Sequence, residues 1–157
     1  MSKLFSKLKI RGIEFPNRLV LSPLCMYSAK DGIPNEWHFS HLSTFARARI
    51  GCIFAEATAV REDGKITPYC LGLWNNDQRN AFKSIVNFIK KMGSIPAFQL
   101  AHAGRKASVK EPWKGGLPLD KDDEKEGVFP WETVAPSALA LANGFRIPKA
   151  LEKKDID

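Results

Sequence analysis

Continuous apolar runs alternate along this chain with segments in which apolar residues recur every three or four positions. The continuous runs predict core strands at 17–23, 52–60 and 95–104. The periodic segments predict helices at 35–51 and 74–93. The resulting order, strand–helix–strand–helix–strand, is typical of a parallel sheet covered by helices, so the sequence predicts an α/β protein.

The second predicted helix carries the clearest local signals. Asn75 followed by Gln78 resembles a capping box at its start. Lys90 and Lys91 suit its end, where positive charge interacts favourably with the helix dipole. The buried stripes are expected to consist of Leu42, Phe45 and Ala46 in the first helix and of Phe82, Ile85, Val86 and Ile89 in the second.

The segments on either side of this pattern are less regular. A hairpin is predicted at 8–15, where two short strands flank Arg11-Gly12. Residues 105–147 show no convincing periodicity and are expected to form a long loop within a single domain spanning 1–157. Loops of this length inside a compact domain are usually functional. The last residues, from 147 on, are expected to begin a further helix.

Composition and cysteine content narrow the protein class. The 157 residues, 44% hydrophobic and 26% charged, suit one globular domain. The start of the chain lacks the apolar run of a signal peptide, and no segment approaches the roughly 18 apolar residues of a membrane span. Cys25, Cys52 and Cys70 form no C-x-x-C pair, which argues against a disulfide framework or a zinc site and for a reducing compartment. We therefore expect a cytoplasmic protein.

The net charge of +7 does not by itself indicate a nucleic-acid partner. The lysines and arginines are spread along the chain, and residues 119–127 form an acidic-rich mixed cluster. No lysine- and arginine-rich block or RNA-binding sheet motif is present. A solvated surface explains such a scattered excess better than nucleic-acid binding does.

Each of the three predicted core strands ends in polar or reactive groups. The first is followed by Cys25 and Tyr27, the second contains the run 56–58 (Glu-Ala-Thr), and the third leads through Gln99 to His102. The carboxyl ends of parallel strands meet at one edge of a sheet, where α/β proteins place their sites. The sequence therefore predicts a functional site at this edge.

Simpler interpretations exist for the individual residues. A lone Cys25 is compatible with a small buried side chain, and Tyr27 with a packed aromatic ring. His38 and His41 lie three residues apart on the first helix, but no carboxylate motif accompanies them, so capping or packing is favoured over metal binding. The glycine motifs that bind the phosphates of dinucleotides and nucleotides are absent.

Four segments together resemble the N-terminal part of the old yellow enzyme family. They are NRLVLSPLCMYS, AEATAV, LGLW and QLAHAGRKAS, in that order along the chain. The similarity is to the branch of xenobiotic reductases and thermophilic-like ene-reductases. The segment running from EPWKGGLPL to VFPWETVAPSALA also resembles the xenobiotic reductase subgroup.

The resemblance implies a (β/α)₈ TIM barrel, of which this chain supplies the N-terminal hairpin and about three strands with their helices. It implies non-covalently bound FMN, reduced by NADPH or NADH. The reduced flavin would pass hydride to the activated C=C bond of an α,β-unsaturated carbonyl compound, and the protein would orient and polarise the reactants.

The resemblance also implies roles for individual residues. Ser22, Pro23, Leu24 and Cys25 would border the flavin, and the Cys25 thiol would tune its reduction potential. These roles come from matching positions in the family motif.

The remaining motif residues match the family in the same way. Ala57 would contribute a backbone contact near a flavin carbonyl, and Gln99 would hydrogen-bond the pyrimidine ring. Tyr27 would donate a hydrogen bond to the substrate's carbonyl oxygen. His102 and the adjoining pair 105–106 match the pattern without an assigned role.

A complete barrel of this kind needs about 250 residues, more than the chain contains. We therefore expect a homo-oligomer or completion by a C-terminal half. Two other classes stay open: a non-catalytic βαβ module that assembles with a partner, and a basic RNA-associated domain. Bound flavin distinguishes the enzyme from both, and salt-dependent binding of a polynucleotide would indicate the RNA-associated domain.

Overall fold

A parallel sheet of four strands forms the centre of the protein, which a computed structural model describes over residues 2–156. Its strands are β3 (Val20–Leu21), β4 (Cys52–Ala59), β5 (Leu71–Gly72) and β6 (Ile95–Ala101). β4 pairs with β6 along its length, with β3 near its start and with β5 at its end. The three predicted strands and their parallel arrangement are confirmed, and β5 is an additional strand that the apolar pattern did not predict.

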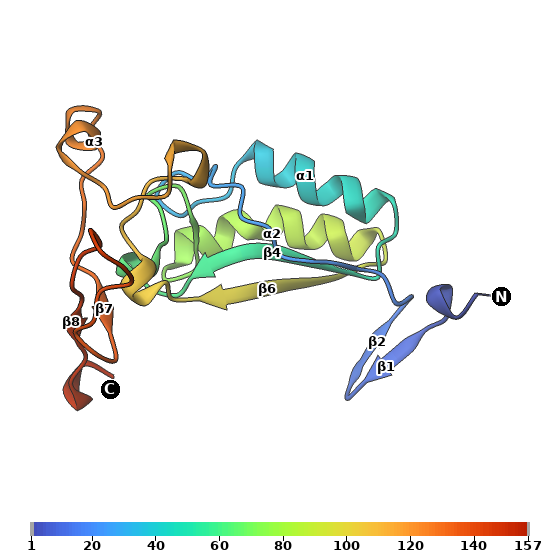
Figure 1. Cartoon of the computed structure of the whole chain (residues 1–157). Helices are drawn as coiled ribbons and strands as arrows, with labels where there is room; N and C mark the ends of the chain where they lie inside the picture. Colours follow the sequence, from blue (N-terminus) through green and yellow to red (C-terminus); the bar gives the residue numbers. More distant parts are fainter. Residues whose placement is uncertain (1, 157) are drawn as a thin grey trace.

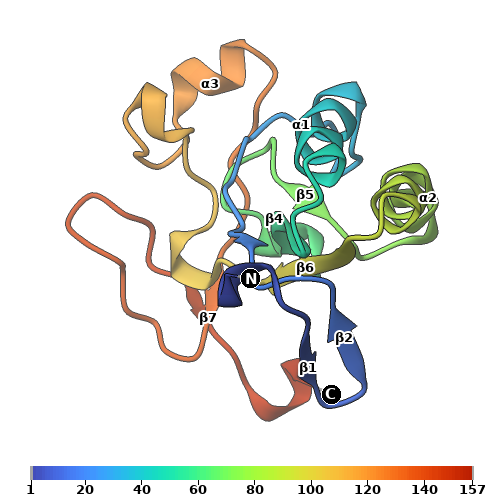
Figure 2. The same ribbon diagram turned by 90° about the vertical axis from the view of Figure 1, so that its right-hand side faces the viewer.

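Two helices cover one face of this sheet, α1 (Glu36–Arg47) and α2 (Asn76–Lys91). They lie side by side over β4 and β6 in both views (Figures 1 and 2). The predicted helices are confirmed, together with the capping box of Asn75 and Gln78. The core between helices and sheet contains Leu42, Ala46, Ile53, Ala55, Leu71, Phe82, Ile85 and Ile89, with Phe45 and Val86 packed against it.

The first predicted core strand needs a correction. Only Val20 and Leu21 pair with β4, and Val20 is 55% exposed. Successive side chains of a strand point to opposite faces. Leu21 packs against the core under the helices, so Val20 points to the opposite face, which neither helix covers. The apolar pattern indicated burial without indicating which face is covered.

The hairpin predicted at 8–15 is confirmed. β1 (Leu8–Ile10) and β2 (Ile13–Phe15) are antiparallel, and the turn places Arg11 at a φ of 53°. A 3₁₀ turn, Lys3–Phe5, precedes the hairpin. The hairpin projects from the end of the sheet at which the strands begin (Figure 1).

The segment after β6 lies at the opposite end of the sheet, where the parallel strands finish (Figure 1). It contains the short helix α3 (Lys121–Lys125) and strand β7 (Val134–Ala135), with 3₁₀ turns at Gly104–Lys106 and Pro112–Lys114. A further 3₁₀ turn, Glu62–Gly64, follows β4. The long segment is therefore irregular, as predicted, although it is not devoid of secondary structure.

The helix expected from residue 147 on is wrong within the described residues. Strand β8 (Lys149–Ala150) pairs parallel with β7, and only a 3₁₀ turn, Lys153–Asp155, follows it. The backbone N–H groups of Lys149 and Leu151 donate to carbonyl oxygens of the 133–135 segment. These tertiary hydrogen bonds replace the helical ones that the local sequence favours.

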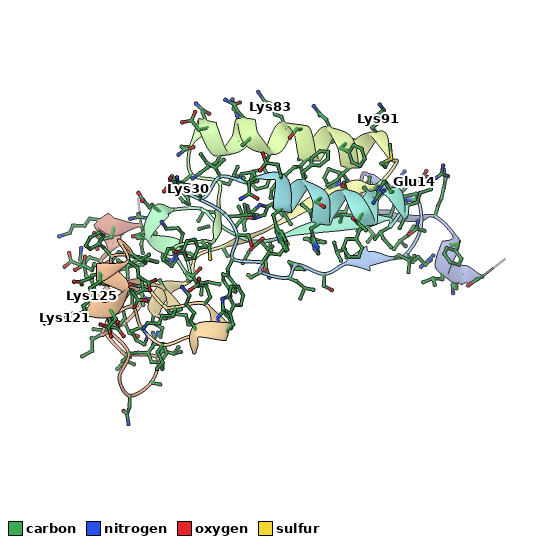
Figure 3. The ribbon with its side chains drawn as sticks, turned by 90° about the horizontal axis from the view of Figure 1, so that it is seen from above. Glu14, Lys30, Lys83, Lys91, Lys121 and Lys125 are labelled. Atoms are coloured by element: carbon green, nitrogen blue, oxygen red, sulfur yellow. The ribbon has the colours of Figure 1, made fainter. Side chains whose placement is uncertain are left out.

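Charged side chains are distributed over the whole molecule. Lys83 and Lys91 project from α2, whereas Lys121 and Lys125 lie at the other end on α3 (Figure 3). This distribution agrees with a scattered positive surface. Within residues 2–156, no helix is long and apolar enough to cross a membrane.

Candidate functional site

Ala57 and Gln99 face each other across β4 and β6. The strand register pairs Ala55 with Phe98 and then Ala57 with Gln99, with a β-bulge between Ala55 and Ala57. The Phe98 ring packs edge-on against Phe82 of α2, with centroids 4.8 Å apart. Alternation along β6 therefore points Gln99 to the helix-free face of the sheet. Gln99 is exposed there.

The turn that follows β3 carries the predicted residues Ser22 to Cys25. Ser22 and Leu24 are exposed, whereas Pro23 and Cys25 are half-buried. Burial raises the pKa of the Cys25 thiol, and the adjacent backbone of Ala57 partly offsets that rise. The fold thus brings Cys25 next to Ala57, and Ala57 next to Gln99. These residues come from three consecutive parallel strands or their ends.

Tyr27 lies in the same turn in an unusual backbone conformation. Its φ is 47°, a left-handed value that is uncommon for residues other than glycine. Its ring packs edge-on against Trp113, with centroids 5.7 Å apart. Burial, followed by the neighbouring Cys25, raises the pKa of the phenol above its ordinary value. Tyr27 therefore stays protonated as a hydrogen-bond donor throughout the neutral and mildly alkaline range.

A cavity of about 340 Å³ adjoins Tyr27. Residues from the segment after β6 complete it: Lys106, Val109, Lys110, Pro112, Gly115, Gly116, Leu141 and Phe145. A larger cavity, about 870 Å³, lies elsewhere, beside the 61–65 loop and the segment 127–131. We place the candidate site at the smaller cavity because it adjoins the turn that carries the thiol and the phenol.

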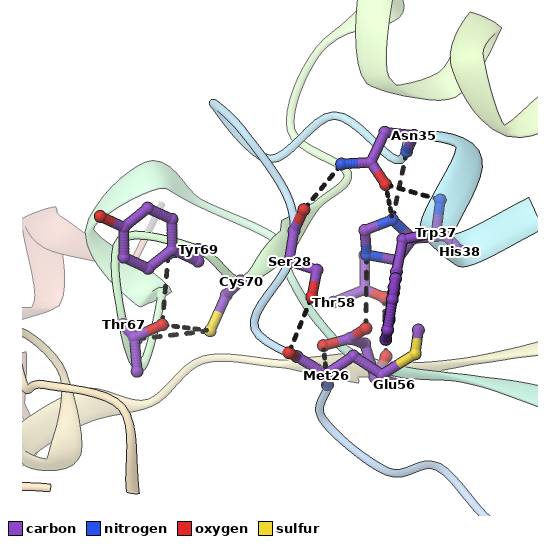
Figure 4. A network of polar contacts seen from close by, with 10 residues as sticks. All are labelled: Met26, Ser28, Asn35, Trp37, His38, Glu56, Thr58, Thr67, Tyr69 and Cys70. Carbon is purple, nitrogen blue, oxygen red and sulfur yellow. Dashed lines mark hydrogen bonds and ion pairs between the residues drawn. The ribbon is translucent and has the colours of Figure 1, made fainter. Parts of the chain in front are cut away.

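Glu56 is a functional candidate to which sequence analysis assigned no role. It is fully buried beside the bulge of β4, and its Oε2 accepts a hydrogen bond from the Met26 N–H at 2.9 Å. Its Oε1 lies 3.5 Å from Nε2 of His38. Figure 4 shows this connection between the turn, the strand and α1. A single charged residue in a strand that is otherwise uncharged was the available signal.

The two histidines of α1 have the capping and packing roles that were favoured. Nδ1 of His38 accepts the backbone N–H of Asn35 at 3.1 Å. The His41 ring packs edge-on against Phe45, with centroids 5.1 Å apart. No group of three or more histidine, cysteine, aspartate or glutamate residues within 2–156 is arranged to hold a metal ion.

The motif residues after β6 contact neighbouring loops. Nε2 of His102 lies 3.6 Å from Oδ1 of Asp63. Nη2 of Arg105 donates to Oγ of Ser137 at 2.9 Å, which links the end of β6 to the long segment. Lys106 is exposed and lines the cavity beside Tyr27.

Comparison with known proteins decides the family. Residues 3–157 match the NADH:flavin oxidoreductase / NADH oxidase family. The chain belongs to this family. The resemblance inferred from the four sequence segments is therefore confirmed.

Curated members of this family are similar over nearly the whole chain. An NADH:flavin oxidoreductase of Gibberella zeae is 44% identical over 99% of this chain and 38% of its own length. An NADPH dehydrogenase of Listeria welshimeri is 41% identical over 99% of this chain and 41% of its own length. The chain thus spans about two fifths of the length of these relatives.

Solved structures confirm the predicted fold. Morphinone reductase superimposes with a TM-score of 0.73 and 26% identity, over 98% of this chain and 40% of its own. The old yellow enzyme from Pichia sp. AKU4542 gives a TM-score of 0.76 at 24% identity, over 98% of this chain and 39% of its own. These solved structures are TIM barrels, so the hairpin, strands and helices described above correspond to part of such a barrel.

Proposed function

We propose that this chain carries the flavin-ring side of an FMN-dependent oxidoreductase. The whole enzyme takes hydride from NADPH or NADH and reduces the activated C=C bond of α,β-unsaturated carbonyl compounds. The observation that carries the proposal is that Cys25 lies next to Ala57, and Ala57 opposite Gln99, at the ends of neighbouring parallel strands. Family membership supports the flavin, and the similarity to NADPH dehydrogenases supports a nicotinamide coenzyme.

The donor and acceptor groups on this face fit the edge of a flavin ring. The exposed Gln99 amide offers two donors and two acceptor sites, which suits the alternating carbonyl and N–H groups of a pyrimidine ring. The small side chain of Ala57 leaves the strand backbone accessible at the same place. Ser22, Pro23 and Leu24 precede Cys25 in the same turn and would border the ring.

The residues of the turn would act on the substrate and on the electronics of the site. FMN, when bound, supplies the hydride chemistry between the coenzyme and the alkene. The protonated Tyr27 phenol would donate a hydrogen bond to the substrate's carbonyl oxygen and so draw electron density from the β-carbon. The Cys25 thiol, neutral because burial raises its pKa, would influence the flavin's potential without adding negative charge.

We propose that activity requires more of a barrel than these 157 residues, and their share of the relatives' length, about two fifths, supports this proposal. Apolar side chains on the sheet and its end support assembly with a further segment, since Val20, Leu24 and Leu100 are 55%, 65% and 61% exposed. We propose that a C-terminal half, on the same or another chain, covers them. The chain alone would then be a catalytically incomplete barrel segment.

A chimera tests the proposed function. The 157 residues are joined to the remaining part of the Listeria welshimeri NADPH dehydrogenase, in place of the segment that they match. We expect bound FMN, oxidation of NADPH or NADH, and stoichiometric loss of 2-cyclohexenone. A folded chimera that binds no FMN contradicts the proposal, and one that oxidises coenzyme without consuming any of several enones contradicts the proposed substrate class.

A further inference from the structure

A series of polar contacts, buried at its centre, connects the start of α1 with the turn that carries Cys25 and Tyr27 (Figure 4). It runs from the Asn35 N–H to the His38 ring, on to the Glu56 carboxylate and then to the Met26 N–H. The side chains of His38 and Glu56 are both fully buried. Burying polar groups lowers stability unless they find specific partners. A structural or functional role is therefore expected for this buried pair.

The His38 ring lies between the start of α1 and Glu56. Its Nδ1 is 3.1 Å from the backbone N of Asn35 and 3.0 Å from Oδ1 of the same residue. Its Nε2 is 3.5 Å from Oε1 of Glu56. Neither Nε2 nor Oε1 has another hydrogen-bond partner among the described residues. A proton on Nε2 would therefore satisfy both buried atoms at once.

Glu56 in turn holds the backbone between the two candidate residues. Its second oxygen accepts the Met26 N–H at 2.9 Å, directly between Cys25 and the left-handed Tyr27. A residue other than glycine in this conformation persists only where its surroundings stabilise it. The hydrogen bond from Met26 is such a constraint, and the β-bulge places the carboxylate beneath the turn.

We propose that Glu56, oriented by His38, is the positioning residue of the Cys25–Tyr27 turn, and that its carboxylate acts on this turn through the Met26 N–H and through its charge beside Cys25. The inference rests on the proposed function, because the turn matters for catalysis only if it borders the flavin. It goes further by assigning a role to a strand residue that reaches the site through the backbone and through its charge.

The groups that face Cys25 make this role testable. They are Glu56 from β4, Tyr27 from its own turn and Cys70 from the loop before β5. Burial is the largest cause of the raised pKa of Cys25, and Glu56 adds to the rise. Removing the charge of Glu56 while keeping its shape should therefore lower the pKa of this thiol.

The first experiment measures alkylation of each cysteine in the 157-residue chain against pH, by mass spectrometry. In Glu56→Gln we expect the Cys25 profile to move to lower pH and its alkylation at pH 8 to become several-fold faster. Glu14→Gln on the exposed hairpin removes the same charge far from the turn and should change nothing. Cys52 and Cys70 are buried, so their continued protection reports an intact fold.

The second experiment measures hydrogen exchange of the Met26 amide. Glu56→Gln keeps an oxygen that can accept this N–H, so protection should persist, whereas Glu56→Ala should accelerate exchange about tenfold or more. If Glu56→Ala also exposes Cys52 and Cys70, His38→Gln replaces it. Glutamine at position 38 can still cap the Asn35 N–H but orients Glu56 less well. We therefore expect hydrogen exchange of the Met26 amide to become several-fold faster.

Two results would overturn the proposal. One is an unchanged Cys25 profile in a folded Glu56→Gln protein. The other is unchanged Met26 exchange in a folded Glu56→Ala or His38→Gln protein. Neither measurement requires flavin, so absence of FMN binding would contradict the proposed function and leave this inference to its own test.

Discussion

Ala57 of β4 lies directly opposite Gln99 of β6 because a β-bulge displaces Glu56 from that position. In a regular register, Glu56 would follow Ala55 as the partner of Gln99. The bulge instead places a small side chain beside the amide on the open face and turns the acidic residue toward His38. Bulges commonly re-aim side chains next to active sites. Here, the extra residue of the bulge lets Ala57 take the proposed ring-binding position and Glu56 the proposed positioning role.

Gln99→Ala should weaken FMN binding by the chimera about tenfold. The variant removes the exposed amide proposed to pair with the pyrimidine ring, and one to two hydrogen bonds of about 1 kcal/mol each give this magnitude. Fluorescence titration of FMN measures the affinity. Asn87→Ala, which removes an exposed amide from α2, is the matched control. Equal affinities for the Gln99→Ala variant and this control would contradict the assignment of Gln99.

Tyr27→Phe in the chimera should slow the reaction of the reduced enzyme with enone on the order of tenfold or more. Flavin reduction by the coenzyme should change little, because the phenol is proposed to contact the substrate carbonyl. Stopped-flow absorbance separates the two half-reactions. The variant keeps the ring that packs on Trp113, so structural damage is minimal. Equal slowing of both half-reactions, or of neither, would contradict the role.

Gln78→Ala should lower the free energy of unfolding by roughly 2–4 kcal/mol. Oε1 of Gln78 accepts from the N–H groups of Trp74 and Asn75 at 2.8 and 3.2 Å, and Nε2 donates to the Asp31 carbonyl at 3.0 Å. The variant leaves these two N–H groups and the carbonyl without the hydrogen-bond partner that the fully buried Gln78 side chain provides. Urea unfolding followed by circular dichroism measures the loss. The exposed neighbour Arg79, changed to alanine, should cost less than about 0.5 kcal/mol.

Alkaline pH should destabilise the protein partly through Cys70. Burial raises the pKa of this thiol above its ordinary value of 9.0. The unfolded chain therefore loses this proton first, so the stabilisation is complete below about pH 9 and is lost as pH rises through the folded pKa. Urea midpoints at pH 7.5 and 10 should differ less in Cys70→Ser than in the parent chain. Ser84→Ala, an exposed change on α2, should leave this difference in urea midpoint unaltered. A fall in the midpoint of Cys70→Ser as large as that of the parent chain would contradict a contribution from Cys70.

The periodicity of the chain was sufficient to predict the βαβαβ order, both helices and the hairpin. These elements have strong local determinants, such as the capping box at Asn75 and Gln78 and the apolar stripe of α2. Four sequence segments were sufficient to identify the family. Local composition also indicated that polar groups gather where the strands end, because parallel strands place their carboxyl ends at one edge.

Other features depended on contacts between distant residues. The exposure of Val20 and Gln99 follows from helices covering only one face of the sheet. Strand β8 exists because its N–H groups find carbonyl partners near Val134. The bulge at Glu56 arises from the pairing of β4 with β6. The hydrogen bond from the Met26 N–H to the Glu56 carboxylate depends on the contact of β4 with the turn. A single sequence specifies which groups each strand offers, whereas register, coverage and hydrogen-bond partners are decided only when the strands and helices pack together.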